Sequence, residues 1–127
     1  MELSISRDAL GIVIDGVITG PRGMKRVKFL LDTGASECFV HRSILIGAGY
    51  PVGEGKHRTM LQTAGGIVQS EDFSVESLRV YENEVKDLRV SCFNIPEESR
   101  IEGLLGLNFL KHFRLTLDFP NGKLIIK

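Results

Sequence analysis

The sequence predicts an all-β protein, and three observations support this fold class. The apolar runs are short and rich in Val, Ile and Leu, as is typical of strands. They are separated by turn-forming residues, among which are 14 glycines. With 127 residues, of which 43% are hydrophobic, the chain is long enough for one hydrophobic core. We therefore expect a single domain over residues 1–127.

Two hairpins are expected in the first half of the chain. Residues 10–18 and 27–31 are strand-like runs on either side of a turn cluster at 20–23. Residues 58–63 and 67–70 flank an Ala-Gly-Gly tip, in which the glycines accept a positive φ without strain. The arms of this second hairpin are mostly polar, so we expect it to project from the body of the protein.

The second half of the chain predicts further strands and one helix. Apolar alternation predicts strands at 73–80, 85–90, 115–119 and 124–126. Residues 106–113 place apolar side chains on one helical face over two turns, which makes this segment the best helix candidate.

The charge balance argues against polyanionic partners. Lys plus Arg and Asp plus Glu number 16 each, so the formal net charge is zero and no global field attracts nucleic acid or a membrane surface. The chain does not open on a basic stretch followed by an apolar run, and no apolar window is as long as a membrane span. We therefore expect a cytoplasmic protein without a nucleic-acid or membrane partner.

The cysteines and histidines do not form a metal-binding pattern. Cys38 and Cys92 lie in apolar, strand-like segments, and we interpret both as reduced core residues. His41, His57 and His112 share no ligand spacing with either cysteine, so we expect neither a metal nor a cofactor.

The segment with the most chemical information is Asp32-Thr33-Gly34, which directly follows the apolar run Phe29-Leu-Leu31. One interpretation is that Asp32 only starts a turn by accepting backbone N–H bonds, as aspartate does in many loops. The other is that the strand carries a catalytic carboxylate. A second apolar segment, Ile101-Glu-Gly-Leu-Leu-Gly106, places its first glycine 71 residues after Asp32 and favours the second interpretation.

Taken together, apolar-apolar-Asp-Thr-Gly-Ala, a Gly-rich mid-chain hairpin and apolar-apolar-Gly before a short helix resemble the retropepsin-like aspartic proteases. The resemblance covers roughly residues 10 to 126 in the correct order. It implies a closed β-barrel with a flap hairpin and one short C-terminal helix. It also implies a peptidase that binds an extended polypeptide.

The resemblance implies roles for individual residues. Asp32 would hold the nucleophilic water, Thr33 would hydrogen-bond across a two-fold axis, and Gly34 would let the substrate backbone approach. Gly106 would allow its segment to pack tightly behind the Asp32 turn. The substrate would be bound by Ala35, Thr63, Ala64, Gly65, Gly66, Ile101 and Leu104. Leu104 and Leu105 could instead be core residues, which is the better interpretation for Leu105.

The sequence departs from the retroviral pattern at two linked positions. Retroviral enzymes usually have an Asp where this chain has Ser36 and an Arg where it has Leu107, and the two form an ion pair. Because both members are absent together, no charge is left without its partner. The chain therefore resembles the bacterial and cellular relatives more than the viral enzymes.

The presence of a single Asp-Thr-Gly predicts a homodimer. Water-mediated peptide hydrolysis needs an acid and a base, and two adjacent carboxylates that share a proton supply both. A C₂ dimer would bring the two Asp32 side chains together, with an interface that we expect at Leu3–Ser6 and Leu124–Ile126. The alternative is a catalytically silent dimeric peptide-binding module on the same fold. The retained Asp32 argues against it, because a charge buried at a dimer axis is costly.

Overall fold

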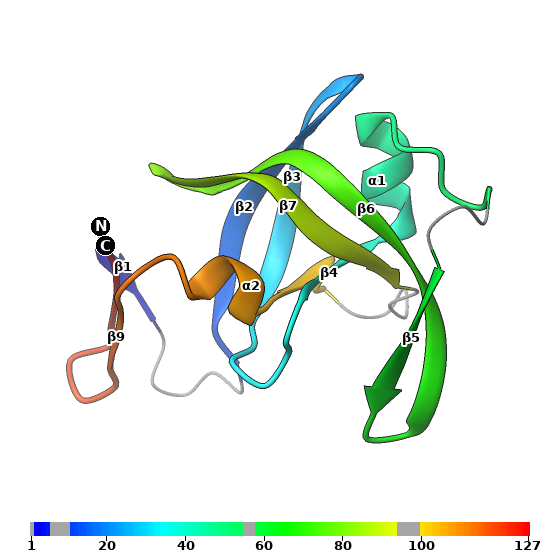
Figure 1. Ribbon diagram of the computed structural model, residues 1–127. Helices are drawn as coiled ribbons and strands as arrows, with labels where there is room; N and C mark the ends of the chain where they lie inside the picture. The colour runs from blue at the N-terminus through cyan, green and yellow to red at the C-terminus, as the bar shows by residue number, and fades with distance from the viewer. Residues whose placement is uncertain (1, 6–10, 55–57, 94–99) are drawn as a thin grey trace.

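Figure 1 shows the chain as a computed structural model, which describes residues 2–5, 11–54, 58–93 and 100–127, with the backbone alone at 58, 59, 61–63, 68 and 93. In chain order the elements are β1 (Glu2–Ser4), β2 (Val13–Gly20), β3 (Gly23–Leu31), β4 (Cys38–His41), α1 (Arg42–Ala48), β5 (Arg58–Thr63), β6 (Gly66–Val80), β7 (Asn83–Phe93), β8 (Gly103–Leu105), α2 (Leu107–Leu110), β9 (Leu115–Asp118) and β10 (Lys123–Ile126). Strands predominate, which confirms the predicted fold class.

Six strands close into a barrel. Their hydrogen-bonded order is β2-β3-β8-β4-β7-β6, and β6 returns to β2 through three pairs that run from Val17↔Arg79 to Thr19↔Ser77. The β2–β3 and β6–β7 hairpins are antiparallel, whereas β8 joins β3 and β4 joins β7 in parallel. Closure gives each of these six strands a neighbour on both sides, which confirms the expected closed barrel.

The core lies inside this barrel. In β2, burial alternates with a period of two, because Ile14 and Ile18 face inward while Val13 and Asp15 are exposed. Phe29 of β3 and Phe109 of α2 are the largest fully buried side chains. Most of the buried apolar residues lie on strands, so apolar runs with a strand period account for most of the interior.

The predicted hairpins are present. β2 and β3 pair up to Gly20↔Gly23, and β5 pairs with the first part of β6 up to Thr63↔Gly66. β6 is longer than expected, because the runs predicted at 67–70 and 73–80 form one continuous strand. Its first part pairs with β5 outside the barrel and its second part with β7 within it. The β5–β6 hairpin therefore projects from the barrel, as a flap is expected to do (Figure 1).

The two ends of the chain form a small separate sheet in the order β1-β10-β9. Leu3 pairs with Leu124, which pairs with Leu117 on its other side, and Lys123 Nζ lies 3.3 Å from Glu2 Oε1. The interface expected at Leu124–Ile126 presumes a free strand edge there, and this is wrong, because both neighbours of β10 come from its own chain. In the part of the chain that the structure describes, the free edges of this sheet belong to β1 and β9.

The helices differ from the prediction in number and in length. α2 is shorter than residues 106–113, and a turn from Leu110 to Phe113 completes the predicted segment. α1 is an additional helix, capped by the His41 Nδ1 atom, which accepts the Ser43 N–H, and ended by Gly49 at a φ of 100°. A seven-residue helix has little intrinsic stability, so α1 depends on packing that the local sequence does not reveal.

Candidate active site

Asp32 lies where β3 ends, in the segment that connects β3 to β4. Parallel pairing places Leu31 of β3 beside Leu105 of β8, and the Asp32 N–H donates to the Leu105 carbonyl at 3.1 Å. Asp32 is half-buried, whereas Thr33 and Gly34 are exposed. The pairing of β3 with β8, whose Leu105 is fully buried, thus holds the backbone of Asp32 while its side chain remains partly exposed. We call residues 32–37 the active-site turn.

The first part of the active-site turn is closed by two short-range hydrogen bonds. Gly34 N–H donates to Asp32 Oδ1 at 2.9 Å, and Ala35 N–H donates to the Asp32 carbonyl at 3.2 Å. The turn-forming role of Asp32 is therefore real, and it is compatible with catalysis. Among the described residues, only one of the two carboxylate oxygens accepts a hydrogen bond, so the other remains available for water or for a second acid.

The segment from Gly106 into α2 holds the active-site turn from behind. Leu107 N–H donates to the Ala35 carbonyl at 2.8 Å, and Asn108 N–H donates to the Ser36 carbonyl at 3.1 Å. The Asn108 side chain accepts the Cys38 N–H at 2.9 Å through Oδ1. Two N–H donors and one side-chain acceptor from this short segment therefore hold the part of the active-site turn that leads into β4.

Gly106 packs against the turn so closely that a side chain would not fit. An added Cβ would lie 2.4 Å from the Glu37 carbonyl oxygen and 2.9 Å from the Ala35 carbonyl oxygen. Gly106 has ordinary extended dihedral angles, so the constraint is steric rather than conformational. The expectation that a glycine here permits tight packing behind the turn is confirmed.

The thiol of Cys38 is part of this packing. Cys38 is fully buried, and its Sγ accepts the Gly106 N–H at 3.3 Å. Burial raises the pKa of the thiol to about 11, so Cys38 stays protonated under ordinary conditions. Cys92 is only half-buried, and no disulfide joins it to Cys38. The interpretation as a core residue therefore holds best for Cys38, and the reduced state of the two thiols stays a prediction.

The predicted flap residues form the tip of the β5–β6 hairpin. Ala64 and Gly65 are exposed, and Gly66 has a φ of 119°, which glycine adopts without strain. The backbone of Thr63 pairs with Gly66, while its side chain lies outside the described residues. In Figure 1 this hairpin and the loop between β3 and β4 extend at the same end of the barrel.

The predicted pocket residues lie on and before β8. Leu104 pairs with Leu30 of β3 and with Phe39 of β4, and it is half-buried, as is Ile101. Leu105 is fully buried, which confirms its interpretation as core. Whether Ile101 and Leu104 contact a substrate side chain stays a prediction.

Asn108 is a site residue that the sequence analysis did not single out. Besides accepting from Cys38, its side chain donates to the Arg89 carbonyl at 2.7 Å through Nδ2, so one amide links β4, α2 and β7. In the sequence, the feature that could have marked Asn108 is that it is the polar residue inside the otherwise apolar segment Leu107–Leu110.

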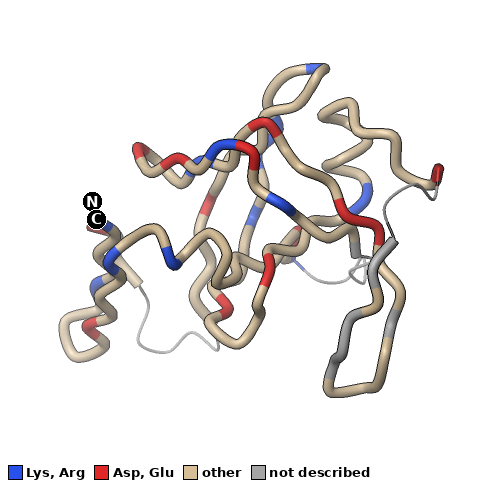
Figure 2. Tube along the Cα trace, in the orientation of Figure 1, with Lys and Arg blue, Asp and Glu red and all other residues tan. Residues whose placement is uncertain are grey.

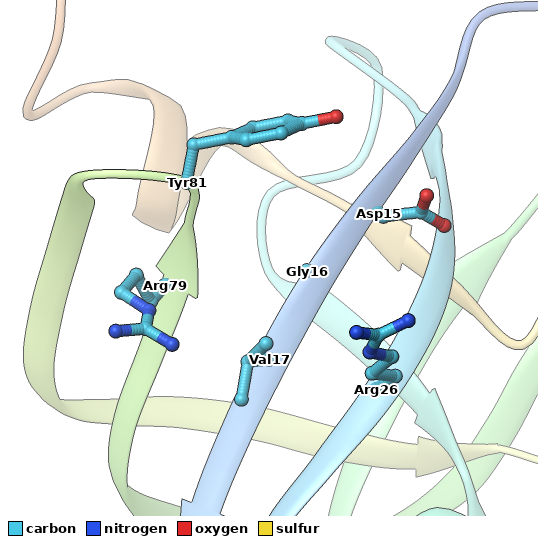
Figure 3. A pocket seen from close by; sticks show the side chains of 6 residues that line it. All are labelled: Asp15, Gly16, Val17, Arg26, Arg79 and Tyr81. Atoms are coloured by element: carbon cyan, nitrogen blue, oxygen red, sulfur yellow. The ribbon is translucent and has the colours of Figure 1, made fainter.

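A pocket of about 340 Å³ lies on the outer face of the barrel and includes none of the predicted site residues. Figure 3 shows Arg26 and Arg79 on either side of Val17, with Tyr81 beyond Arg79 and Asp15 beyond Arg26. Asp32 and the flap tip do not line this pocket. It is therefore separate from the candidate active site.

Figure 2 shows Lys, Arg, Asp and Glu at positions distributed along the barrel strands rather than gathered in one segment. Among the described residues, no three His, Cys, Asp or Glu side chains gather where they could hold a metal ion. Neither helix in the described ranges is long and apolar enough to cross a membrane.

Comparison with known proteins gives one family and one fold. The model of the family described as "gag-polyprotein putative aspartyl protease" matches residues 18–112, which span the active-site turn, the flap hairpin and α2. The chain also superposes on the crystal structure of a retropepsin-like aspartic protease from Rickettsia conorii with a TM-score of 0.71 and 19% identity, over 99% of this chain and 88% of that one. At that identity the second match establishes a shared fold. A search of curated protein sequences found no match.

Proposed function

The chain belongs to the gag-polyprotein aspartyl protease family, and from this premise we propose that it is a homodimeric aspartic endopeptidase. It would hydrolyse peptide bonds with a water molecule held between two Asp32 carboxylates, one from each protomer. The observation on which the proposal rests is the single Asp-Thr-Gly turn, held by backbone hydrogen bonds at the end of an apolar strand.

The chemistry requires two carboxylates in different protonation states. An ionised Asp32 would take a proton from water while the water oxygen attacks the peptide carbonyl carbon, and the protonated Asp32 of the second protomer would protonate the carbonyl oxygen. The tetrahedral intermediate would then collapse, and the amine would leave with a proton from the first Asp32. As the new carboxyl group forms, a hydroxyl of the intermediate would return its proton to the second Asp32, which restores the starting pair. Two adjacent carboxylates share one proton, so the pair begins each cycle with one acid and one base.

Exposed apolar side chains beside the turn and at the terminal sheet support dimerisation. Leu107 is 43% exposed although its backbone bonds to the active-site turn, and Leu117 and Phe119 at the β9 edge of the terminal sheet are 36% and 55% exposed. A two-fold dimer that brings the two turns together would remove Leu107 from water, and one that extends to the terminal sheets would also cover Leu117 and Phe119.

The proposed substrate is a polypeptide in an extended conformation. It would lie between the active-site turn and the flap tip and would form strand-like hydrogen bonds with both. Ala35, Ile101 and Leu104 would contact its side chains, and residues 63–66 would close over it. Because these contacts are mostly aliphatic, we expect apolar side chains next to the cleaved bond.

The location of the enzyme is part of the same proposal. Cys38 and Cys92 are both unpaired, which is the state that a reducing compartment maintains. A protease active in the cytoplasm fits this state.

The decisive experiment is the substitution Asp32→Asn. It removes the proton-accepting group but keeps the shape, so hydrolysis of a peptide library should be lost while circular dichroism and melting temperature stay close to wild type. Asp15→Asn is the matched control, because Asp15 is an exposed aspartate on the outer face of β2. Retained hydrolysis in Asp32→Asn would refute the proposal. Peptide binding without hydrolysis in the wild type would favour the silent binding module.

A mixing experiment tests the dimer. Activity per chain should fall on dilution, and excess Asp32→Asn protein should inhibit the wild type by forming inactive heterodimers. Specific activity that is independent of concentration, together with a monomeric mass by light scattering, would contradict the dimer.

A further inference from the structure

Four polar residues meet between the active-site turn and the root of the flap: Glu37, Asp72, Arg89 and Ser91. Glu37 is the last residue of the turn before β4 begins. Asp72 follows the last β5–β6 pair, where the flap strand enters the barrel, and it pairs with Ser91 of β7. Arg89 lies two residues before Ser91, on the same face of β7. The cluster therefore joins the two elements that would enclose a substrate.

The contacts in this cluster are close and reciprocal. Ser91 Oγ lies 3.0 Å from Glu37 Oε2 and 2.8 Å from Asp72 Oδ1. Arg89 Nη2 donates to Asp72 Oδ2, and Arg89 Nε lies 3.6 Å from Glu37 Oε1. One hydroxyl and one guanidinium thus each contact both carboxylates.

The hydroxyl alone cannot satisfy two carboxylates. Ser91 has one proton, so it donates to Glu37 or to Asp72 but not to both at once. The guanidinium has five N–H donors in a planar fork and a permanent charge, so it can serve both. The hydrogen bond from Arg89 to Asp72 and the charges of Glu37 and Asp72 raise the pKa of Arg89 further.

The burial of the cluster makes the cation important. Ser91 is fully buried and the Asp72 side chain is 8% exposed, whereas Glu37 and Arg89 are 23% and 52% exposed. Among the described residues, the charged groups of the cluster are Glu37 from the turn, Asp72 from β6 and Arg89 from β7. α2 contributes the neutral amide of Asn108. Ser70 Oγ also lies 3.5 Å from Asp72 Oδ1, but a neutral hydroxyl does not replace a positive charge. Without the guanidinium, the like charges of Glu37 and Asp72 would repel each other across the Ser91 hydroxyl and push the turn and the flap root apart.

We propose that Arg89 is a positioning residue that fixes the root of the flap against the active-site turn by holding Glu37 and Asp72 together. This inference rests on the proposed function, because it assigns Arg89 to the two walls of the same peptide site. When Arg89 holds the turn and the flap root in place, the protein loses less conformational entropy on binding a peptide. Replacement of Arg89 should therefore raise mainly KM.

The first test replaces the charge and keeps the length of the side chain. Arg89→Met should raise KM about tenfold at pH 7 and change kcat less than about threefold, because the reacting groups stay in place. The defect should be smaller at pH 5, where protonation of one carboxylate relieves the repulsion. Arg89→Lys should recover part of the loss, since an ammonium supplies the charge but not the fork.

The second test removes one of the opposed charges. Adding Glu37→Gln to Arg89→Met should restore KM at pH 7, because it removes one of the two opposed charges and the amide can still accept from Ser91 or donate to it. Arg26→Met is the matched control, since Arg26 is an exposed arginine on the outer face of β3. An Arg89→Met defect of equal size at both pH values, which the double variant does not relieve, would overturn the proposal.

A stability measurement separates this proposal from the proposed function. In Arg89→Met, folding holds the two carboxylates together, so the folded state binds a proton more tightly than the unfolded state and stability is lost as pH rises. The difference in melting temperature from wild type should therefore grow from pH 5 to pH 7, and it should stay constant for Arg26→Met.

A constant difference for Arg89→Met would refute the electrostatic link even in an active enzyme. If the pH-dependent difference appears but Asp32→Asn still hydrolyses peptides, only the proposed function fails. If Arg89→Met does not fold, Arg89→Lys allows the same comparison.

Discussion

Replacing Gly106 by alanine is expected to destabilise the protein and to displace the active-site turn. The added Cβ would lie 2.4 Å from the Glu37 carbonyl oxygen, and ordinary contact begins at 3.4 Å, so backbone atoms must move by about 1 Å. These atoms belong to the turn itself and cannot rotate away as the end of a side chain could. The hydrogen bonds from Leu107 and Asn108 to the turn must stretch in response.

The size of the effect follows from these contacts. Overpacking costs about 1–3 kcal/mol, and weakening one of the two hydrogen bonds adds about 1 kcal/mol, so we expect a loss of about 2–4 kcal/mol. For a chain of 127 residues, 1 kcal/mol corresponds to about 4 °C, which predicts a melting temperature lower by about 8–16 °C. A displacement of about 1 Å at a catalytic group can reduce kcat/KM by about 100-fold.

Thermal unfolding and peptide hydrolysis of Gly106→Ala should be measured beside Gly47→Ala. Gly47 lies inside α1, where a Cβ would meet only the flexible Lys25 side chain, with Cε at 3.0 Å. Alanine is favoured over glycine in a helix interior by about 0.5–1 kcal/mol, so this control should melt about 2–4 °C higher than wild type. If Gly106→Ala keeps wild-type stability and activity, the steric reasoning is refuted.

Three further predictions concern other parts of the barrel. Burial raises the pKa of Cys38 from 9.0 to about 11, so the unfolded thiol ionises first, and denaturant titrations should show roughly 2–3 kcal/mol lost between pH 9 and 11 in wild type but not in Cys38→Ala. Tyr50→Phe removes a hydroxyl that donates to the Thr19 carbonyl and accepts the Glu76 N–H, so a thermal melt should show a loss of about 1–2 kcal/mol. The pH profile of kcat/KM should peak near about pH 5–6. Ala35→Ser should move its upper limb toward acid, since the new hydroxyl favours an ionised carboxylate; an unchanged or alkaline-shifted limb would contradict this account.

The local sequence determined the hairpins and the active-site turn. The β2–β3 and β5–β6 hairpins join neighbours along the chain, so strand periodicity and turn residues were enough to predict them. Strand periodicity also predicted the two strands that pair as β6 and β7. The chemistry proposed for Asp32 also comes from the local sequence, because an apolar strand, a carboxylate and a glycine are consecutive there.

Elements without a strong local signal were predicted poorly. α1 forms because Leu45 and Ala48 are buried against the barrel, which a seven-residue window cannot show. The place of β10 depends on β1, which lies at the opposite end of the chain and occupies one of its two edges. Both outcomes result from packing between distant segments rather than from the propensity of either segment.

The tertiary structure alone decided what holds the active-site turn. Ser91 contacts Glu37 across 54 residues of sequence, and Asn108 contacts Cys38 across 70. Serine, asparagine and glutamate are common on solvated surfaces, so no local pattern marks these residues as members of a buried cluster. The sequence determined which group can transfer a proton, because that property belongs to the Asp32 carboxylate itself. Closure of the barrel decided how this group is supported, because hydrogen bonds and charge pairs depend on distances that only the folded chain sets.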